Sequence, residues 1–275
     1  MRGFKKQTLL TSTLLALCLL SGCTKNFADT PFNSDDKKVS GIINGKFVTD
    51  DSVLSKTTVL LANPVVGEIC TATLLGGNYA LTAAHCLDQE KPENMYVFFG
   101  TQPNGNSERR QVVAMKASPY WELRRREAKN TGDIAIIKFD GGPLPKGYVA
   151  AELLENSNLL KNGLNATVLG YGITEANIDE GEGILRMAIL PILDKDFSST
   201  EITLDQSKGS SVCHGDSGGP AYVYIPPTKK TTGHYALWGI SNRGLNDNDN
   251  DCQGSVAYTN VLIYLVWIQN VLRTL

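Results

Sequence analysis

Short runs of β-branched and aliphatic residues follow one another along the chain from Ile42 onward, and glycine, asparagine, proline and aspartate separate them. Many short strands at such spacing are typical of an all-β barrel or sandwich. Near the C-terminus the period changes, because Val261, Leu265, Ile268 and Leu272 recur at the spacing of one apolar helix face. We therefore expect an all-β fold closed by one helix. The strands are expected at 57–62, 70–75, 79–84, 95–100, 111–117, 133–139, 166–172, 185–193, 221–226, 235–240 and 255–261.

The N-terminal part of the chain has the layout of an export signal. A basic start at residues 2–6 precedes a mostly apolar run at 9–20, which is too short to span a bilayer. The residues Leu-Ser-Gly-Cys at 20–23 resemble the lipobox of bacterial lipoproteins, which implies a lipid on Cys23. We predict a lipoprotein signal peptide at 1–22, and the alternative is an ordinary signal peptide with a chance cysteine.

Residues 23–41 are polar and are predicted to form a tether or a pro-segment between the lipid and the folded domain. Several acyl chains on Cys23 would anchor the protein stably, because each buried CH₂ contributes about 0.8 kcal/mol of membrane binding. We therefore expect an exported protein of the bacterial cell envelope, bound to a membrane through Cys23.

The composition adds nothing to the predicted fold, but it excludes some classes of partner. Hydrophobic residues make up 42% of the chain and charged residues 20%, which is ordinary for a soluble globular domain. The net charge of −2 gives no basic surface of the kind that binds nucleic acid, so no nucleic-acid partner is expected. Glycine and proline at 141–148 interrupt the strand pattern.

The cysteine count fits an exported protein. Cys18 leaves with the signal peptide and Cys23 takes the lipid, so an even set of four remains for an oxidising compartment. No pair of cysteines or histidines has zinc-site spacing, and no metal is expected. The acidic run at 246–251 is interpreted as a solvated turn, with calcium binding as the alternative, since it lacks the glycine and glutamate of an EF-hand. The four remaining cysteines are Cys70, Cys86, Cys213 and Cys252.

One hydroxyl, that of Ser217, is flanked by glycines on both sides in the stretch CHGDSGGP. A serine hydroxyl is a weak nucleophile and needs a base to take its proton. Imidazole is the usual base, and His85 stands at the end of a predicted strand in LTAAHC. Asp133 begins another apolar strand in DIAIIKF, where a carboxylate costs free energy unless it is paired. These three residues are the candidates for nucleophilic catalysis.

The stretches LTAAHC, DIAIIKF and CHGDSGGP, in this order, closely resemble the chymotrypsin/trypsin family of serine proteases. The resemblance covers residues 42–275. It implies two packed six-stranded antiparallel barrels at about 42–145 and 146–260, with a C-terminal helix at about 261–274. It also implies a serine endopeptidase that needs no cofactor, acts on proteins or peptides, and works as a monomer.

The family's site residues carry over onto matching positions. His85 is then general base and later general acid, Asp133 orients it, and Ser217 is the nucleophile. The backbone N–H groups of Gly215 and Ser217 form the oxyanion hole, which explains the absence of a side chain at Gly215. The resemblance further implies disulfides Cys70–Cys86 and Cys213–Cys252. It assigns the primary substrate pocket to Ser211, Val212, His214 and Val256, which favours cleavage after small or medium uncharged residues.

The chain departs from the family beside the substrate. Asn242 and Arg243 replace the serine and tryptophan of the usual substrate-binding edge, so this edge is expected to differ. A catalytically silent binding or adhesion module on the same fold is the alternative function. The stretch LRRREAK at 123–129 is interpreted as a solvated loop. Because this loop borders the substrate cleft in the family, attraction of acidic substrates by the arginines at 124–126 is the alternative reading.

Activation by cleavage is a further expectation from the resemblance. Ile42-Ile43-Asn44-Gly45 is similar to the mature N-terminus of the family, whose freed α-amino group pairs with the residue matching Asp216. Gly41 precedes Ile42, so an activating protease of trypsin-like specificity is not implied at that bond. The cut would also release the protein from Cys23. The alternative is an uncut chain in which Ile42 simply begins the first strand.

Overall fold

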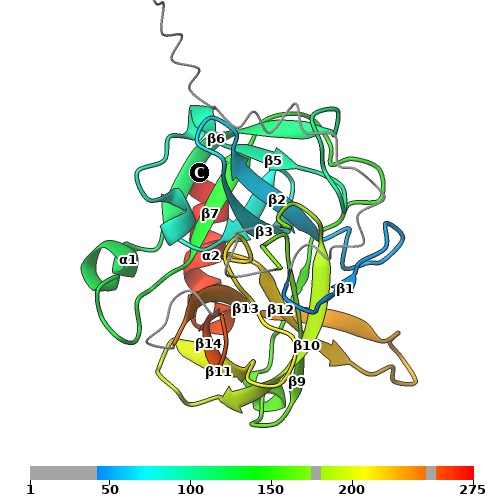
Figure 1. Ribbon diagram of the computed structural model, residues 1–275, viewed down its shortest axis with the longest axis vertical. Coiled ribbons are helices and arrows are strands. Elements are labelled where there is room, and N and C mark those ends of the chain that lie inside the picture. The colour runs from blue at the N-terminus through cyan, green and yellow to red at the C-terminus, as the bar shows by residue number, and fades with distance from the viewer. Residues whose placement is uncertain (1–41, 175–180, 246–251) are drawn as a thin grey trace, which may run out of the picture.

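The computed structural model describes residues 42–174, 181–245 and 252–275 (Figure 1). The predicted signal peptide, the tether with Cys23 and the acidic run at 246–251 lie outside the described residues. In the described part, the strands form two barrels, the first in the upper half of Figure 1 and the second in the lower half. Each of the predicted strands overlaps a strand of the structure, and the all-β prediction is confirmed.

The first barrel is a closed ring of six antiparallel strands in the order β2-β3-β4-β7-β6-β5. Its centre is aliphatic and aromatic, and side chains such as Leu60, Leu74 and Ile137 have no exposed surface. All six residues of β2 are buried, which suits a run without polar alternation. The strands are β2 (Thr58–Asn63), β3 (Glu68–Gly76), β4 (Tyr79–Thr82), β5 (Tyr96–Phe98), β6 (Arg109–Ala117) and β7 (Ala135–Phe139).

The second barrel runs β10-β11-β14-β13-β12-β9 and closes because β9 also pairs with β10. These ladders are antiparallel, so the predicted pair of six-stranded antiparallel barrels is confirmed. A short strand, β8 (Glu152–Leu153), adds to β13 in parallel. The strands are β9 (Asn165–Gly170), β10 (Arg186–Asp194), β11 (Glu201–Asp205), β12 (Pro220–Ile225), β13 (His234–Gly244) and β14 (Ser255–Asn260).

Three strands of this sheet differ from the prediction, and the two-residue strand β8 is one of them. Strand β1 (Lys46–Phe47) pairs with β10, so the segment expected to begin the first barrel joins the sheet of the second. Strand β11 is absent from the predicted set, because its five residues hold only two strongly apolar side chains, Ile202 and Leu204. Its partner strand β14 buries those residues, and tertiary pairing therefore makes a strand where the local pattern was too short to show one.

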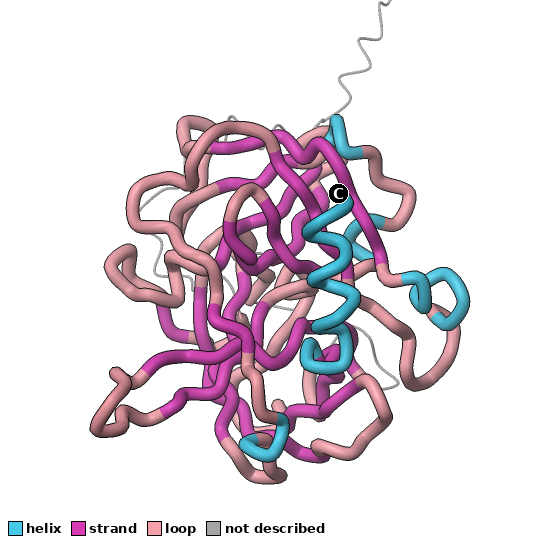
Figure 2. Tube along the Cα trace, turned by 180° about the vertical axis from the view of Figure 1, so that it is seen from behind, coloured by secondary structure: helices cyan, strands magenta, loops and turns pink. Residues whose placement is uncertain are grey.

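The C-terminal helix joins the two barrels. It begins as a 3₁₀ turn at Val261–Tyr264 and continues as α2 (Leu265–Thr274), as expected for about 261–274. In Figure 2 it runs along the outside of the strands from the second barrel towards the first. Ile268 and Val271 pack in the same hydrophobic cluster as the first barrel, and Lys138 Nζ donates to the carbonyl oxygen of Leu275 at 2.8 Å.

The remaining helices are short. Helix α1 (Pro119–Arg124) occupies a segment whose end was expected to be a loop, and it begins at Ser118, whose hydroxyl accepts from the N–H of Tyr120. Among the residues that the structure describes, no helix is long and apolar enough to cross a bilayer. The other 3₁₀ turns are His85–Leu87, Pro92–Asn94 and Ser157–Leu159.

Candidate active site

The first barrel brings His85 and Asp133 together through two neighbouring strand ends. Strand β4 pairs with β7, and Thr82 lies opposite Ala135. His85 follows the end of β4 and Asp133 precedes the start of β7, so both side chains emerge at the same edge. The Nδ1 atom of His85 lies 2.7 Å from Asp133 Oδ2, and the backbone N–H of His85 donates to Oδ1 at 2.9 Å.

The buried carboxylate changes the basicity of the imidazole. Asp133 has no exposed surface, and both of its oxygens bond to His85. Burial of the His85 ring disfavours its charged form, but the charge and hydrogen bond of Asp133, together with the charge of Asp88, outweigh that effect. The pKa of His85 therefore lies above its ordinary value, and the Nδ1 atom is held as the proton donor to Asp133.

Ser217 lies in the loop before β12, on the second barrel. Contacts to the first barrel hold this loop: the N–H of Thr71 donates to the carbonyl of Ser217 at 2.8 Å, and Thr71 Oγ1 donates to the carbonyl of Gly215 at 3.0 Å. On its own barrel, the N–H of Gly218 donates to the carbonyl of Ser241 at 2.9 Å. The backbone around Ser217 is therefore positioned from both barrels.

The glycines around Ser217 meet two separate demands. Gly215 and Gly218 have φ values of +86° and +77°, which side chains disfavour. A Cβ atom on Gly218 would also collide with the hydroxyl of Thr82 and the carbonyl of Thr71. Within the described part of the chain, the N–H groups of Gly215 and Ser217 donate to no protein acceptor. Two backbone donors of this kind, here two residues apart in the chain, are what an oxyanion requires.

A cavity of about 720 Å³ joins the residues contributed by the two barrels. His85, Gly215 and Ser217 all line it, together with His214, which the sequence assigned to the pocket. The remaining described lining comes mainly from the first barrel and includes three carboxylates. These are Leu61, Asn63, Gly67, Glu68, Ile69, Cys70, Cys86, Glu90, Met95, Ile173 and Glu182.

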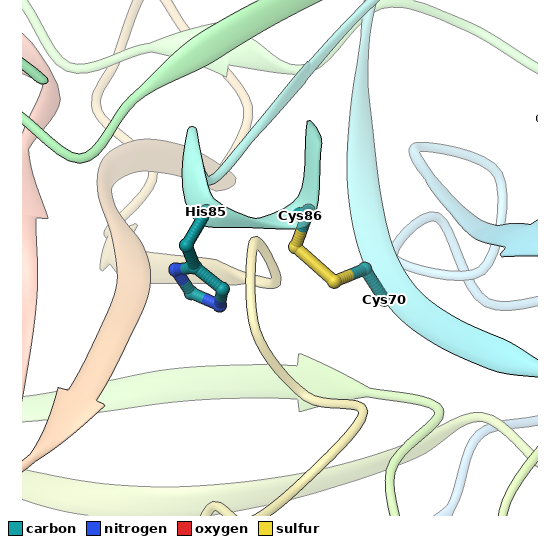
Figure 3. A group of neighbouring side chains, drawn as sticks. All are labelled: Cys70, His85 and Cys86. Atoms are coloured by element: carbon teal, nitrogen blue, oxygen red, sulfur yellow. A yellow bond between two sulfur atoms is a disulfide. The ribbon is translucent and has the colours of Figure 1, made fainter. Parts of the chain in front are cut away.

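Both disulfides predicted from the resemblance are formed, Cys70–Cys86 and Cys213–Cys252. Figure 3 shows His85 and Cys86 projecting side by side from the same short helix, with the bridge reaching across to Cys70 on β3. Each bridge lies close to a histidine, His85 in one case and His214 in the other. Disulfide sulfurs are not thiolates, so these two His/Cys groups lack the sulfur ligands that zinc binds.

Three of the predicted pocket residues lie deeper in the second barrel. Ser211, Val212 and Val256 expose 2–6% of their surface, and among the described residues they are not part of the cavity lining. Ser211 pairs through its backbone with Ile43, with N–O distances of 2.9 and 3.0 Å. Val212 and Val256 pack in the hydrophobic cluster of that barrel. His214, in contrast, is exposed.

Asp216 is buried beside Ser217. The N–H groups of Gly172 and Cys213 donate to its oxygens at 2.8 and 2.9 Å. Burial raises the pKa of Asp216 to about 7, and these donors, with the backbone N–H of Ile42, oppose the rise. Ile42 is itself fully buried and has a φ of +35°, which is unusual for a β-branched residue. The structure thus brings together the two residues predicted to act in activation.

Sequence reasoning missed one charged residue near the site. Glu201 on β11 is fully buried and forms an ion pair with Arg243, whose position the sequence had marked as unusual. Burial disfavours the Glu201 carboxylate, but hydrogen bonds and charge from Arg243, with two donors on Thr131, hold its pKa below the usual value. The weak strand pattern at 201–205 hid this residue. A glutamate alternating with the apolar residues of that segment was the available signal.

Comparisons with known proteins agree with this geometry. The model of the Trypsin family matches residues 42–268. Chymotrypsin-like elastase family member 1 of Felis catus is 27% identical over 221 residues, covering 74% of this chain and 79% of the relative. The human protein of the same name is also 27% identical, covering 74% and 81%. A chymotrypsin of Phaedon cochleariae is 26% identical over 258 residues, covering 90% and 88%. The chain belongs to the trypsin-like serine protease family.

Proposed function

We propose that the protein is a serine endopeptidase in which His85, Asp133 and Ser217 form the catalytic triad. One observation carries the proposal: His85, bonded at 2.7 Å to a fully buried carboxylate, lines the same cavity as Ser217 and Gly215. A buried aspartate of this kind orients the imidazole and stabilises its protonated form.

The chemistry follows from these positions. His85 Nε2 accepts the Ser217 hydroxyl proton as Ser217 Oγ bonds to the carbonyl carbon of the substrate. The N–H groups of Gly215 and Ser217 stabilise the resulting oxyanion. Its collapse breaks the C–N bond, and His85 returns the proton to the leaving amine. Water, deprotonated by His85, then hydrolyses the acyl-enzyme and regenerates Ser217.

A fluorophosphonate probe tests this proposal against the alternative of a silent binding module. The wild-type protein, after any activating cleavage, should be labelled, and Ser217→Ala should not be. Ser210→Ala, in the same loop, is the matched control and should label like wild type. An unlabelled wild-type protein that also cleaves no peptide would support the binding module.

The proposed substrates are proteins or peptides cleaved after small or medium uncharged residues. Ser211 carries no charge to pair with lysine or arginine, and Val256 fills space in the second barrel. The matching relatives named as elastases agree with this choice. A panel of peptide anilides tests it, with Ala, Val and Leu expected to exceed Arg and Lys. A clear preference for Arg or Lys would contradict the assignment.

We further propose that cleavage before Ile42 activates the protein. The freed α-amino group would give Asp216 a positive partner in place of a neutral peptide N–H. It would also relieve the left-handed backbone at Ile42, which costs about 1–2 kcal/mol. N-terminal sequencing of the active species should find Ile42, and Asp216→Asn should lower its activity. Full activity in a chain that still begins at Cys23 would refute the cut.

The proposed location is the bacterial cell envelope, with a lipid on Cys23 and release on activation. Mass spectrometry of the N-terminal peptide should find the acylated cysteine. Cys23→Ala should move the uncut protein from the membrane to the soluble fraction. An active, cut form that remains in the membrane fraction would contradict release.

A further inference from the structure

The ion pair between Glu201 of β11 and Arg243 of β13 belongs to the second barrel, and both residues contact the segment that leads into Asp133. Arg243 Nη1 donates to Glu201 Oε1 at 3.0 Å, and Nη2 donates to Oε2 at 3.1 Å. This is the two-pronged geometry that makes arginine–carboxylate pairs strong and directional. Arg243 Nη2 also donates to the carbonyl of Ala128 at 2.6 Å. The guanidinium therefore connects two strands of the second barrel to a loop of the first.

Glu201 binds the same loop at a second point, which lies nearer to Asp133 along the chain. Its Oε1 atom accepts from the N–H of Thr131 at 3.1 Å and from the Thr131 hydroxyl at 2.9 Å. The amide of Asn242 donates to Glu201 Oε1 at 3.2 Å and to Thr131 Oγ1 at 3.1 Å. Thr131 is only two residues before Asp133, so these contacts fix the backbone that carries the buried aspartate.

Other contacts extend this attachment along the same loop. The side-chain oxygen of Asn130 accepts from the N–H and hydroxyl of Thr200, both at 3.1 Å. On the far side, the hydroxyl of Thr259 donates to the carbonyl of Asp133 at 2.8 Å. Lys129 Nζ donates to the carbonyl of Phe197 at 3.0 Å. The loop at 128–133 is thus attached to the second barrel at nearly every residue.

We propose that Glu201 and Arg243 are positioning residues, which hold the Asp133 segment against the second barrel and so set the His85–Asp133 geometry. Arg243 neutralises Glu201, and Glu201 in turn orders Thr131. Without Arg243, a fully buried carboxylate would be left without its cation, and the loop would move to bring that carboxylate towards water. This inference rests on the proposed protease function for its kinetic test, but not for its structural test.

The structural test is the titration of His85 followed by NMR in Arg243→Gln and in Thr131→Val. The acids that raise the pKa of His85 are Asp133 and Asp88, and only the Asp133 segment is attached to Arg243. Displacing Asp133 should lower the His85 titration midpoint in both variants, more in Arg243→Gln. Thr131→Val is nearly isosteric and tests the other end of the link if Arg243→Gln does not fold.

A matched control separates positioning from general loss of stability. Arg110 also pairs with a glutamate, Glu108, and donates to the carbonyls of Gly142 and Pro143, but it lies away from the cavity. Arg110→Gln should lower the melting temperature without moving the His85 midpoint. The double variant Glu201→Gln, Arg243→Gln removes the buried charge and should recover part of the wild-type midpoint.

The kinetic test uses a minimal ester that hardly contacts the substrate-binding edge. The kcat of Arg243→Gln should fall about 10- to 100-fold, because small misplacements of catalytic groups have effects of that size. Its KM should change little. If only the KM of long peptides changed, Arg243 would be a substrate-contact residue and the proposal would be wrong. An unchanged His85 midpoint in Thr131→Val would likewise overturn it.

The two proposals fail in different ways. If the wild-type protein hydrolyses nothing but its His85 midpoint responds to Arg243→Gln, the positioning role stands and the protease function fails. If hydrolysis occurs and the His85 midpoint does not respond, only the positioning role fails.

Discussion

His85 and Asp133 come from adjacent strand ends of the first barrel, whereas Ser217 lies on a loop of the second barrel held by residues distant in sequence. The first pair is brought together by the pairing of β4 with β7 and joined by two hydrogen bonds, of 2.7 and 2.9 Å. The serine loop depends on Thr71 of the other barrel and on the buried Asp216. One half of the site is therefore built by local sheet geometry, and the other half is conditional on contacts that a cut or a substitution can alter.

The attachment of the Asp133 segment shows that the first half of the site also depends on contacts between distant residues. Asp133 belongs to the first barrel, but the loop before it is held by Glu201 and Arg243 of the second. Each barrel thus supports a segment of the proposed triad on the other, because Thr71 does the same for Ser217. Opening of the interface between the barrels would disturb both halves of the site together.

The largest effect is expected from removing the charge of Asp133, in the half of the site that local sheet geometry builds. Asp133→Asn should lower kcat about 10⁴-fold, since the amide no longer holds the reactive tautomer of His85. Steady-state kinetics on a peptide substrate measure the loss. Asp140→Asn, at the other end of β7, is the control and should keep wild-type activity. A loss below tenfold in Asp133→Asn would show that the pair is structural.

The half of the site that carries Ser217 depends on the buried Asp216, and this should make the stability of the protein depend on pH. Burial raises the Asp216 pKa from 3.8 to about 7, so the folded uncut chain binds a proton that the unfolded chain has already released. Protonated Asp216 therefore stabilises the folded chain fully below pH 4, and this stabilisation is lost as the pH rises to about 7. The loss should be about 4 kcal/mol, from a pKa difference of roughly three units.

Urea unfolding of the uncut chain between pH 4 and pH 8 measures this effect. The decline should be absent in Asp216→Asn, which cannot ionise at that position. It should also shrink after cleavage before Ile42, because the α-amino group then pairs with the carboxylate. Parallel pH profiles for the uncut protein and Asp216→Asn would contradict the assignment.

Packing of the serine loop against the first barrel can be tested at Gly218. Gly218→Ala should destabilise the fold by about 3 kcal/mol, because its Cβ would collide with Thr71 and Thr82 and its φ is positive. Gly163→Ala is a matched control, since Gly163 has a similar φ of +81° but open space around it. Thermal unfolding should give a clearly smaller loss for the control. Equal losses of stability in the two variants would mean that the positive φ, and not the collisions with Thr71 and Thr82, destabilises Gly218→Ala.

The smallest expected effect concerns Asp88, whose charge also raises the pKa of His85. Asp88→Asn removes one cause of the raised His85 pKa but keeps an oxygen that can accept from the indole N–H of Trp121. The acid limb of kcat/KM should move slightly to lower pH, since His85 then loses its proton more easily. A shift to higher pH would show that Asp88 does not act through its charge.

Much of the fold was accessible from the sequence because the barrels are built from local patterns. Short apolar runs punctuated by turn residues marked most strands, and a helical period marked α2. The catalytic candidates were recognisable because His85, Asp133 and Ser217 each sit in a distinctive stretch at a strand end. Both disulfides followed from the family resemblance and are formed. The strands, the helix and the three stretches depend on residues close to one another along the chain, whereas the disulfides join residues 16 and 39 positions apart and needed the resemblance.

Tertiary structure alone decided the features that depend on pairing between distant segments. Strand β11 exists because β14 and β10 flank it, and its own five residues carried too little pattern to predict it. The placement of Lys46–Phe47 on the second barrel has the same origin, because Phe47 pairs with Arg186, 139 residues further along the chain. Arg243 was visible as an unusual residue, but its partner Glu201 and the loop before Asp133 became linked only on folding. A buried charge must find its counterion in space, and sequence separation does not show which one it finds.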